Sequence, residues 1–256
     1  MTIGSMSDLA ASARQTIMWQ KASANGNTWW RSPYKVAGIP GAGSDPGNTA
    51  NGVVPTSATA GFPAINFQSG QGFISNIDLM TGTANSYFVL LDRLWHAGAY
   101  SFNSNVTLSA QPSYAGRVPN GDYSGLELWF ECVTSMVGTL TITVTYTDQD
   151  GNTGHSTSAS IGSGTTAGSS LPIPFAAGDS GIRKVESVVG SVATGGTFNL
   201  FVARRLFASP KIQLSYFFYT FPLDQIGFVE VFPTTALLWL MQNSNNHNCY
   251  IEIASK

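Results

Sequence analysis

Residues 139–146, which read TLTITVTY, decide the fold of this chain. Apolar side chains occupy every second position, and threonines occupy the positions between them. Because successive side chains of a strand point to opposite faces of a sheet, this period of two predicts a strand with one buried and one solvated face. Half-buried strands of this kind are typical of antiparallel sheets.

The same alternation extends along most of the chain. Residues 126–133 alternate in the same way, and residues 136–138 supply a turn before the TLTITVTY strand. Short strands joined by Gly, Ser and Asn turns predict an all-β fold, an antiparallel β-sandwich of jelly-roll-like form. A parallel sheet would need crossover helices, and the sequence suggests none after residue 20. Further strands are expected at residues 73–80, 87–95, 153–161, 171–175, 182–189, 198–207, 226–232, 236–242 and 248–254.

The N-terminal part of the chain has a different character. Residues 5–20 have helix-like spacing with a capping Ser-Asp pair, which predicts one short helix. Residues 21–72 are rich in Pro and Gly but carry aromatics that a disordered tail would lack. We therefore expect a long, ordered, extended arm over residues 1–71, followed by a sandwich domain over residues 72–256. The arm residues expected to anchor it at an interface are Trp29, Trp30, Tyr34, Phe62 and Phe67.

The chain carries very little charge. Asp, Glu, Lys and Arg make up 10% of its 256 residues, against roughly 25% in an ordinary soluble domain. Buried interfaces disfavour Lys, Glu and Asp, so this composition suits a protein packed against many neighbours. A net charge of −2 without clustered basic residues argues against nucleic-acid binding.

The chain also lacks the usual signs of export or membrane insertion. Its first residues, MTIGSMSDLAASARQ, contain no basic and apolar regions of a signal peptide. The longest apolar run, residues 236–241, falls far short of the roughly 20 residues that span a bilayer. We therefore expect a soluble protein made in a cytosol, with no membrane partner. Cys132 and Cys249 lie in alternating apolar stretches and are expected to be buried free thiols.

No pattern in the sequence indicates a metal site or a cofactor site. Residues 148–152, DQDGN, resemble the start of a calcium loop, but Asp-Gly between strands predicts a hairpin turn instead. The three histidines, His96, His155 and His247, have no partner at metal-ligand spacing. Residues 41–47 lack the third glycine of a dinucleotide-binding turn. We therefore expect no metal and no cofactor.

The sequence likewise shows no catalytic constellation. It contains no Gly-x-Ser-x-Gly elbow. Glu127 and Glu131 would lie roughly 13 Å apart along a strand, beyond the 6.5–9.5 Å or so that inverting glycosidases use. These two carboxylates are interpreted as surface residues, and the chain is not expected to be an enzyme.

Aromatic residues supply the remaining hint of function. Trp29, Trp30 and Tyr34, with Tyr114 and Tyr123, could form a sugar-stacking platform. Alternatively they bury at a subunit interface, where Trp and Tyr are enriched. We favour the interface because these arm residues must pack against something for the arm to be ordered.

Several segments resemble a group of tailed-bacteriophage virion proteins. They are residues 50–65, 92–102, 111–117, 179–187 and 251–254. The resemblance spans most of the chain and carries no catalytic residues. It implies residence in the virion after synthesis in the host cytoplasm, as a capsid decoration or cement protein. The implied partners are the major capsid protein and copies of the chain itself, with a trimer as one arrangement. A tail or baseplate component, including a glycan-binding host-adhesion module, is the alternative, and a glycan-cleaving enzyme is a second rival.

Overall fold

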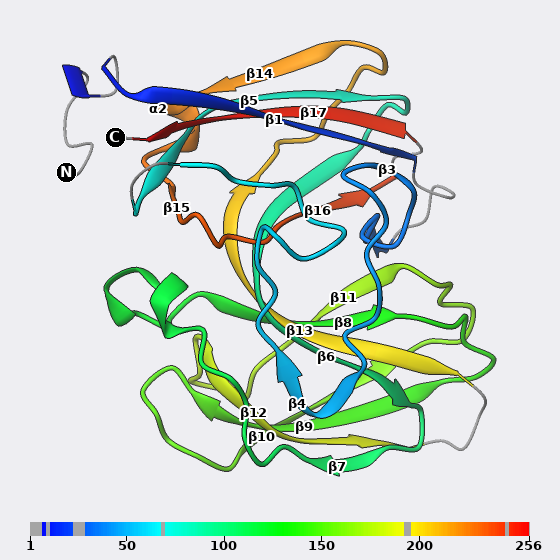
Figure 1. Ribbon diagram of the computed structural model, residues 1–256. Coiled ribbons are helices and arrows are strands. Elements are labelled where there is room, and N and C mark those ends of the chain that lie inside the picture. Colours follow the sequence, from blue (N-terminus) through cyan, green and yellow to red (C-terminus); the bar gives the residue numbers. More distant parts are fainter. Residues whose placement is uncertain are drawn as a thin grey trace. The chain divides into compact units, whose positions relative to one another are not determined.

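β-strands are the main secondary structure of the described residues, and helix is scarce (Figure 1). The computed structural model describes residues 7–8, 11–22, 29–67, 70–191, 196–243 and 246–255. The strands are β1 (Ala13–Ala22), β2 (Trp30–Arg31), β3 (Gly38–Ile39), β4 (Asn48–Val53), β5 (Gly72–Thr81), β6 (Tyr87–Ser101), β7 (Asn105–Thr107), β8 (Leu126–Cys132), β9 (Leu140–Asp148), β10 (His155–Ile161), β11 (Ser169–Ile173), β12 (Ile182–Gly190), β13 (Thr197–Ala208), β14 (Phe218–Pro222), β15 (Glu230–Val231), β16 (Leu237–Gln242) and β17 (Asn246–Ser255). The short helical elements are η1 (Ala115–Arg117), η2 (Pro119–Gly121) and α2 (Leu223–Ile226). The prediction of an all-β, antiparallel sandwich fold is confirmed.

The chain forms two compact units built from interleaved segments. Unit 1 comprises Met1–Ser44, Thr56–Asp92 and Leu206–Lys256, and unit 2 comprises Asp45–Pro55 and Arg93–Arg205. The long strands β6 and β13 each contribute residues to both units.

Unit 1 contains an antiparallel sheet in the order β14–β5–β17–β1–β3, with β15 also paired to β5. β1 and β17 pair over ten residues, from Ala13 opposite Ser255 to Ala22 opposite Asn246. Unit 1 also contains β16, which pairs with β2 and with the first half of β6. Trp19, Ile77 and Ile251 are buried from three adjacent strands, so the sheet has one apolar face.

Unit 2 is a sandwich of two packed sheets. One sheet has the order β10–β9–β12–β7, and the other includes β11, β8 and β13. The core between them joins Ile142 and Val188 of the first sheet to Phe130, Ile173 and Phe198 of the second. The alternation in the TLTITVTY stretch is confirmed, because its apolar side chains in β9 are buried in this core while alternate threonines are exposed or half-buried.

The helix expected over residues 5–20 is wrong from Ala13 onward, where the chain forms β1. Ser7 and Asp8 do have helical backbone. In β1 the side chains of Ile17, Trp19 and Lys21 are buried and those between them are exposed, which is a period of two rather than of 3.6. Ile17 lies opposite Ile251 and Trp19 lies opposite Cys249 in the neighbouring strand β17. This pairing fixes which side chains of β1 face the core.

The described segments of the expected arm, residues 1–71, contain strands β1 to β4. These segments lie in both units, with residues 45–55 in unit 2 and the others in unit 1. The strand expected at residues 226–232 is reduced to the two residues of β15, because α2 and the loop after it occupy the earlier positions. None of the helices formed by the described residues is long and apolar enough to cross a membrane.

Candidate assembly surface

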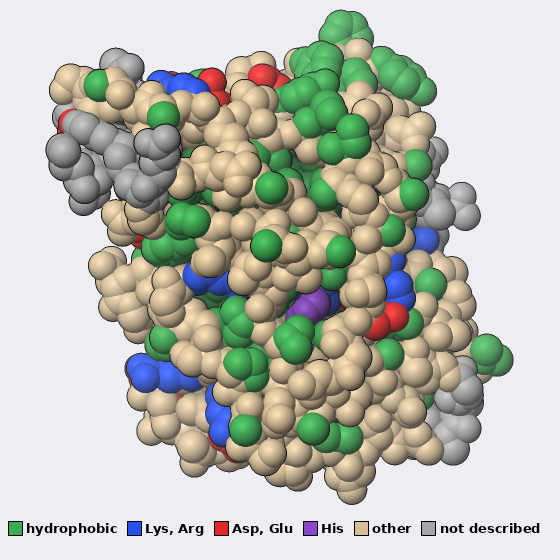
Figure 2. All heavy atoms as spheres, in the orientation of Figure 1, with side chains coloured by type: hydrophobic (Ala, Val, Ile, Leu, Met, Phe, Trp, Pro, Cys, Tyr) green, Lys and Arg blue, Asp and Glu red, His purple; other side chains and the backbone are tan. Residues whose placement is uncertain are grey.

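Four strongly exposed apolar side chains of unit 1 lie close together in one loop. We call residues 213–218, which run from the segment after β13 to the first residue of β14, the aromatic loop. Tyr216 is 74% exposed, Phe217 is 61% exposed, and Leu214 and Phe218 are each 55% exposed. Figure 2 shows hydrophobic side chains gathered at the upper right of the view, where Figure 1 places this connection. Residues 212–222 contain no Asp, Glu, Lys or Arg.

The aromatic loop is fixed to the sheet rather than projecting freely. The Tyr216 N–H donates to the Thr81 carbonyl oxygen at 2.8 Å, and the Leu214 N–H donates to the Tyr219 hydroxyl oxygen at 2.9 Å. The Phe218 ring lies 6.1 Å from the Tyr250 ring. Tyr216 has a φ of 61°, a left-handed conformation that costs energy for a residue with a side chain. The loop therefore holds its aromatics outward at a cost in backbone strain.

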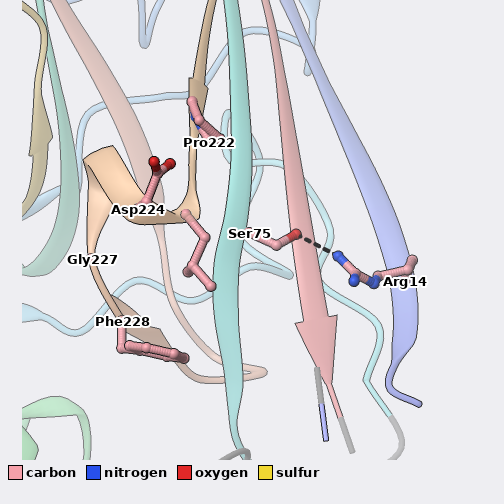
Figure 3. Close-up of a pocket in the computed structure, with 7 residues that line it drawn as sticks. Arg14, Ser75, Pro222, Asp224, Gly227 and Phe228 are labelled. Carbon is pink, nitrogen blue, oxygen red and sulfur yellow. Dashed lines mark hydrogen bonds between the residues drawn. The ribbon is translucent and has the colours of Figure 1, made fainter. Parts of the chain in front are cut away.

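A pocket of about 620 Å³ lies at the other end of β14 (Figure 3). Its lining residues are Arg14, Ser75, Pro222, Leu223, Asp224, Gly227 and Phe228. Figure 3 shows the α2 segment with Asp224 and Phe228 on one side, and Ser75 of β5 and Arg14 of β1 on the other. Phe228 is 56% exposed, and its ring meets the Phe73 ring edge-on at 6.1 Å. The walls are therefore largely apolar.

The charge of Arg14 is balanced within the protein. Its Nη1 donates to the Ser75 hydroxyl at 2.9 Å and to Glu252 Oε1 at 2.5 Å. The Ser75 hydroxyl in turn donates to Glu252 Oε1 at 2.6 Å. An apolar side chain can therefore occupy the pocket without leaving the guanidinium without an anion.

Of the five predicted interface residues, Tyr34 and Phe62 are buried within unit 1. Their ring centroids lie 4.9 Å apart, and the Tyr34 hydroxyl donates to the Ala60 carbonyl oxygen. Trp30 and Phe67 are half-buried, and Trp29 is 39% exposed. Trp29 is thus the one with the most surface left for a partner.

A buried lysine helps to hold this segment on unit 1. The Lys21 ammonium donates to the carbonyl oxygens of Pro33, Tyr34 and Gly41, each at 3.2 Å. Burial lowers the pKa of the Lys21 ammonium to about 8. The segment that the sequence presents as irregular is therefore tied to β1 by three charge-assisted hydrogen bonds.

The two loop tyrosines considered for sugar stacking do not form an open platform. Tyr114 is buried, and its hydroxyl donates to the carbonyl oxygens of Ile182 and Arg183. Burial, and then the neighbouring Tyr123, raise the pKa of Tyr114 well above its usual range. The Tyr123 ring is covered by the Arg183 guanidinium at 4.6 Å.

Folding brings together one cluster of metal-ligand residues that the sequence spacing does not reveal. Asp148, His155 and Asp179 each offer a ligand atom, and these atoms lie within 4.8 Å of one another. His155 Nδ1 lies 2.8 Å from Asp179 Oδ2, and His155 Nε2 lies 3.6 Å from Asp148 Oδ2. Their chain positions are separated by a hairpin turn and by a whole strand, so no short motif marks them.

The carboxylates of this cluster are already engaged by the protein. Asp148 Oδ1 accepts the N–H groups of Asp150, Gly151 and Asn152, and Asp148 Oδ2 accepts the Asn152 side-chain amide. Burial alone would raise the pKa of the Asp148 carboxyl, but these hydrogen bonds outweigh it and lower that pKa. The hairpin turn predicted at residues 148–152 is confirmed, because it connects the paired strands β9 and β10. The hydrogen bonds of Asp148 stabilise this turn.

The interpretation of Glu131 as a surface residue is wrong. Glu131 is buried, accepts two hydrogen bonds from the Arg93 guanidinium at 2.9 and 3.4 Å, and accepts a third from the Asn199 amide. Glu127 is partly exposed and pairs with Arg205 at 2.6 Å. The predicted buried free thiols at Cys132 and Cys249 are confirmed.

No family model matches the chain, and no curated protein matches it. Among solved structures, the chain is similar to that of the infectious bursal disease virus Gx strain, with 10% identity over 94% of this chain and 80% of that chain and a TM-score of 0.22. It is similar also to the VP2 subviral particle of infectious bursal disease virus, with 10% identity over 94% of this chain and 79% of that chain and a TM-score of 0.22. Likenesses with TM-scores this low carry no weight for fold or function.

Proposed function

We propose that this chain is a structural protein of a bacteriophage virion that stabilises the head as a capsid decoration or cement protein. The observation that carries the proposal is the aromatic loop, an uncharged apolar feature that is hydrogen-bonded to the sheet and exposed on a protein of very low charge. Exposed apolar patches rimmed by polar residues mark interaction sites, and large aromatics supply much of the binding energy of protein interfaces. The resemblance of several segments to tailed-phage virion proteins points the same way.

In this proposal the protein acts mechanically, without catalysis or a cofactor. It is made in the host cytoplasm and resides in the virion, where its partners are the major capsid protein and other copies of itself. Trp29 and the aromatic loop provide contacts on unit 1, and many weak contacts on a repetitive surface add avidity. The head is stabilised because apolar area is buried between neighbouring subunits.

Mass spectrometry of purified virions, followed by immunogold electron microscopy, tests the proposal. We expect the chain in the particle at a copy number comparable to that of capsid subunits, with label on the head. Label confined to the tail or baseplate would favour the host-adhesion alternative, which then predicts saturable binding to a host polysaccharide. Absence of the chain from purified virions would overturn a virion role altogether.

A binding assay then tests the surface itself. Heads lacking the protein are mixed with the wild-type chain, with Phe217→Ser or with Val137→Ser. Val137 is 82% exposed and lies in unit 2, so it is a matched loss of one exposed apolar side chain. We expect Phe217→Ser to occupy fewer sites on the heads than the wild type, and Val137→Ser to occupy as many as the wild type. Equal occupancy by all three proteins would exclude the aromatic loop from docking.

A further inference from the structure

We propose that His155 Nε2 and Asp148 Oδ2 bind a divalent transition-metal ion such as Zn²⁺, and that Asp179 orients the His155 ring. The three side chains come from different segments of unit 2. Asp148 ends β9, His155 begins β10, and Asp179 lies in the loop between β11 and β12. In this proposal the ion ties the β9–β10 hairpin to that loop, and the site is independent of the assembly role.

The contact between His155 and Asp179 defines which ring nitrogen is available. His155 Nδ1 lies 2.8 Å from Asp179 Oδ2. An ionised carboxylate only accepts hydrogen bonds, so Nδ1 carries the proton and Nε2 of the neutral ring keeps its lone pair. The Tyr146 hydroxyl donates to the same Asp179 oxygen at 2.5 Å and holds the carboxylate in place. Histidines that bind metals commonly donate their other ring nitrogen to a carboxylate in this way.

The free ring nitrogen faces a second carboxylate at a distance that suits a shared ion. His155 Nε2 lies 3.6 Å from Asp148 Oδ2, which is too long for a good hydrogen bond. Two ligand atoms that each lie about 2.1 Å from a tetrahedral ion are about 3.4 Å from each other. A lone pair that faces a carboxylate oxygen is electrostatically unfavourable, so this geometry favours a cation between the two atoms.

Asp148 is prepared to act as the second ligand. Its side chain is 3% exposed, and its Oδ1 accepts three backbone N–H groups of the turn. Its Oδ2 accepts the Asn152 amide at 2.7 Å and retains a second lone pair. The His155 side chain is 32% exposed, so an ion can enter from solvent and water can complete its coordination.

The ligand atoms favour a transition metal over Ca²⁺. An imidazole nitrogen with a carboxylate oxygen suits Zn²⁺, whereas Ca²⁺ takes six to eight oxygen ligands. All three histidines are described by the structure, and His96 and His247 are buried. Zinc bound by an imidazole therefore reports on His155. Such binding would correct the expectation, drawn from residue spacing, that the chain takes no metal.

Isothermal titration calorimetry with zinc chloride, on protein without an affinity tag, tests the proposal. We expect saturable binding of one zinc ion per chain, no saturable binding of calcium, and a higher unfolding temperature with zinc. His155→Gln removes the imidazole ligand and should abolish zinc binding. Asp179→Asn keeps both ligands but removes the charge that orients the ring, and should weaken binding about 10–100-fold.

Asp150→Asn is the matched control, because Asp150 is an exposed carboxylate of the same turn outside the cluster. It should bind zinc as the wild type does, and circular dichroism should show the same strand signal for all variants. In NMR spectra of the wild type, which need no variant to fold, zinc should shift the ring signals of one histidine.

Three results would overturn the proposal. The first is a wild-type protein that does not bind zinc saturably, which would mean that a second proton, rather than a metal, lies between His155 and Asp148. The second is equal binding by the wild type and His155→Gln. The third is a loss in Asp150→Asn as large as that in Asp179→Asn, because binding would then follow the general negative charge of the turn.

Discussion

His247 should make unit 1 sensitive to mild acid. The side chain is buried in β17, its ring lies 6.1 Å from the Phe88 ring, and neither ring nitrogen has a hydrogen-bond partner among the described residues. Burial, and then the positive charge of Lys21, lower the pKa of His247 from 6.5 to about 3. The unfolded chain therefore takes up a proton as the pH falls through about 6.5, while the folded chain stays neutral down to about 3. Stability that is present above pH 6.5 is lost progressively on acidification.

The size of the loss follows from the width of that window. Each pH unit between the two pKa values costs about 1.4 kcal/mol, so lowering the pH from 7 to 5 costs about 2 kcal/mol through His247. This is a large share of a typical stability of 5–15 kcal/mol or so. His247→Phe keeps a ring in the site and removes the titration.

Urea unfolding of the wild type and of His247→Phe at pH 7, 6 and 5 measures the effect. The wild type should lose about 2 kcal/mol more than the variant over this interval. Above pH 7.5 the two stabilities should run parallel, which serves as the internal control. Equal losses in both proteins between pH 7 and 5 would refute the reasoning.

Four further outcomes are expected. Phe198→Ala removes a ring stacked on Phe130 in the core of unit 2 and should cost about 3–5 kcal/mol in denaturant unfolding. Glu131→Gln breaks a buried ion pair and should cost about 3–5 kcal/mol, whereas Glu127→Gln, at a partly exposed pair, should cost less than about 1 kcal/mol. Deleting residues 1–60 removes β1 and β3 from one side of their sheet and leaves β17 without its ten-residue pairing to β1, so cooperative unfolding of unit 1 should disappear from calorimetry. Particles carrying the protein should retain it through a wash in concentrated sodium chloride, because apolar burial survives salt that screens charge; release of the folded protein would contradict this.

The all-β class was predictable because the alternation of apolar and polar residues can be recognised within a single strand. In β9, threonines on the solvated face alternate with side chains that enter the core, and no distant information is needed to read them. β1 was not predictable in the same way. Its spacing also satisfies a helix, and the choice is made by pairing with β17, which lies more than 200 residues away.

The two units and the candidate surface depend on still longer-range relations. β6 crosses from unit 1 to unit 2 without any change in composition, so the sequence carries no boundary at residue 92. The pocket joins Arg14, Ser75 and the α2 segment, which meet only because β1, β17 and β5 are neighbours in the sheet. The sequence shows that the aromatic loop is apolar. It does not show whether these residues form a buried strand or an exposed contact loop, because both have the same composition.

The low charge of the chain is also a property of its exterior. Among the described residues, seven that carry charge are buried, namely Lys21, Arg31, Asp92, Arg93, Arg117, Glu131 and Asp148. Some of these groups make contacts inside the protein. Arg93 forms an ion pair with Glu131, and the Lys21 ammonium donates hydrogen bonds to three carbonyl oxygens. The exterior therefore keeps the low share of charged residues that the 10% composition indicates, and long-range repulsion between copies is correspondingly weak. A surface that repels little and exposes an uncharged aromatic loop favours close contact with neighbours, which is the physical basis of the assembly role proposed for this chain.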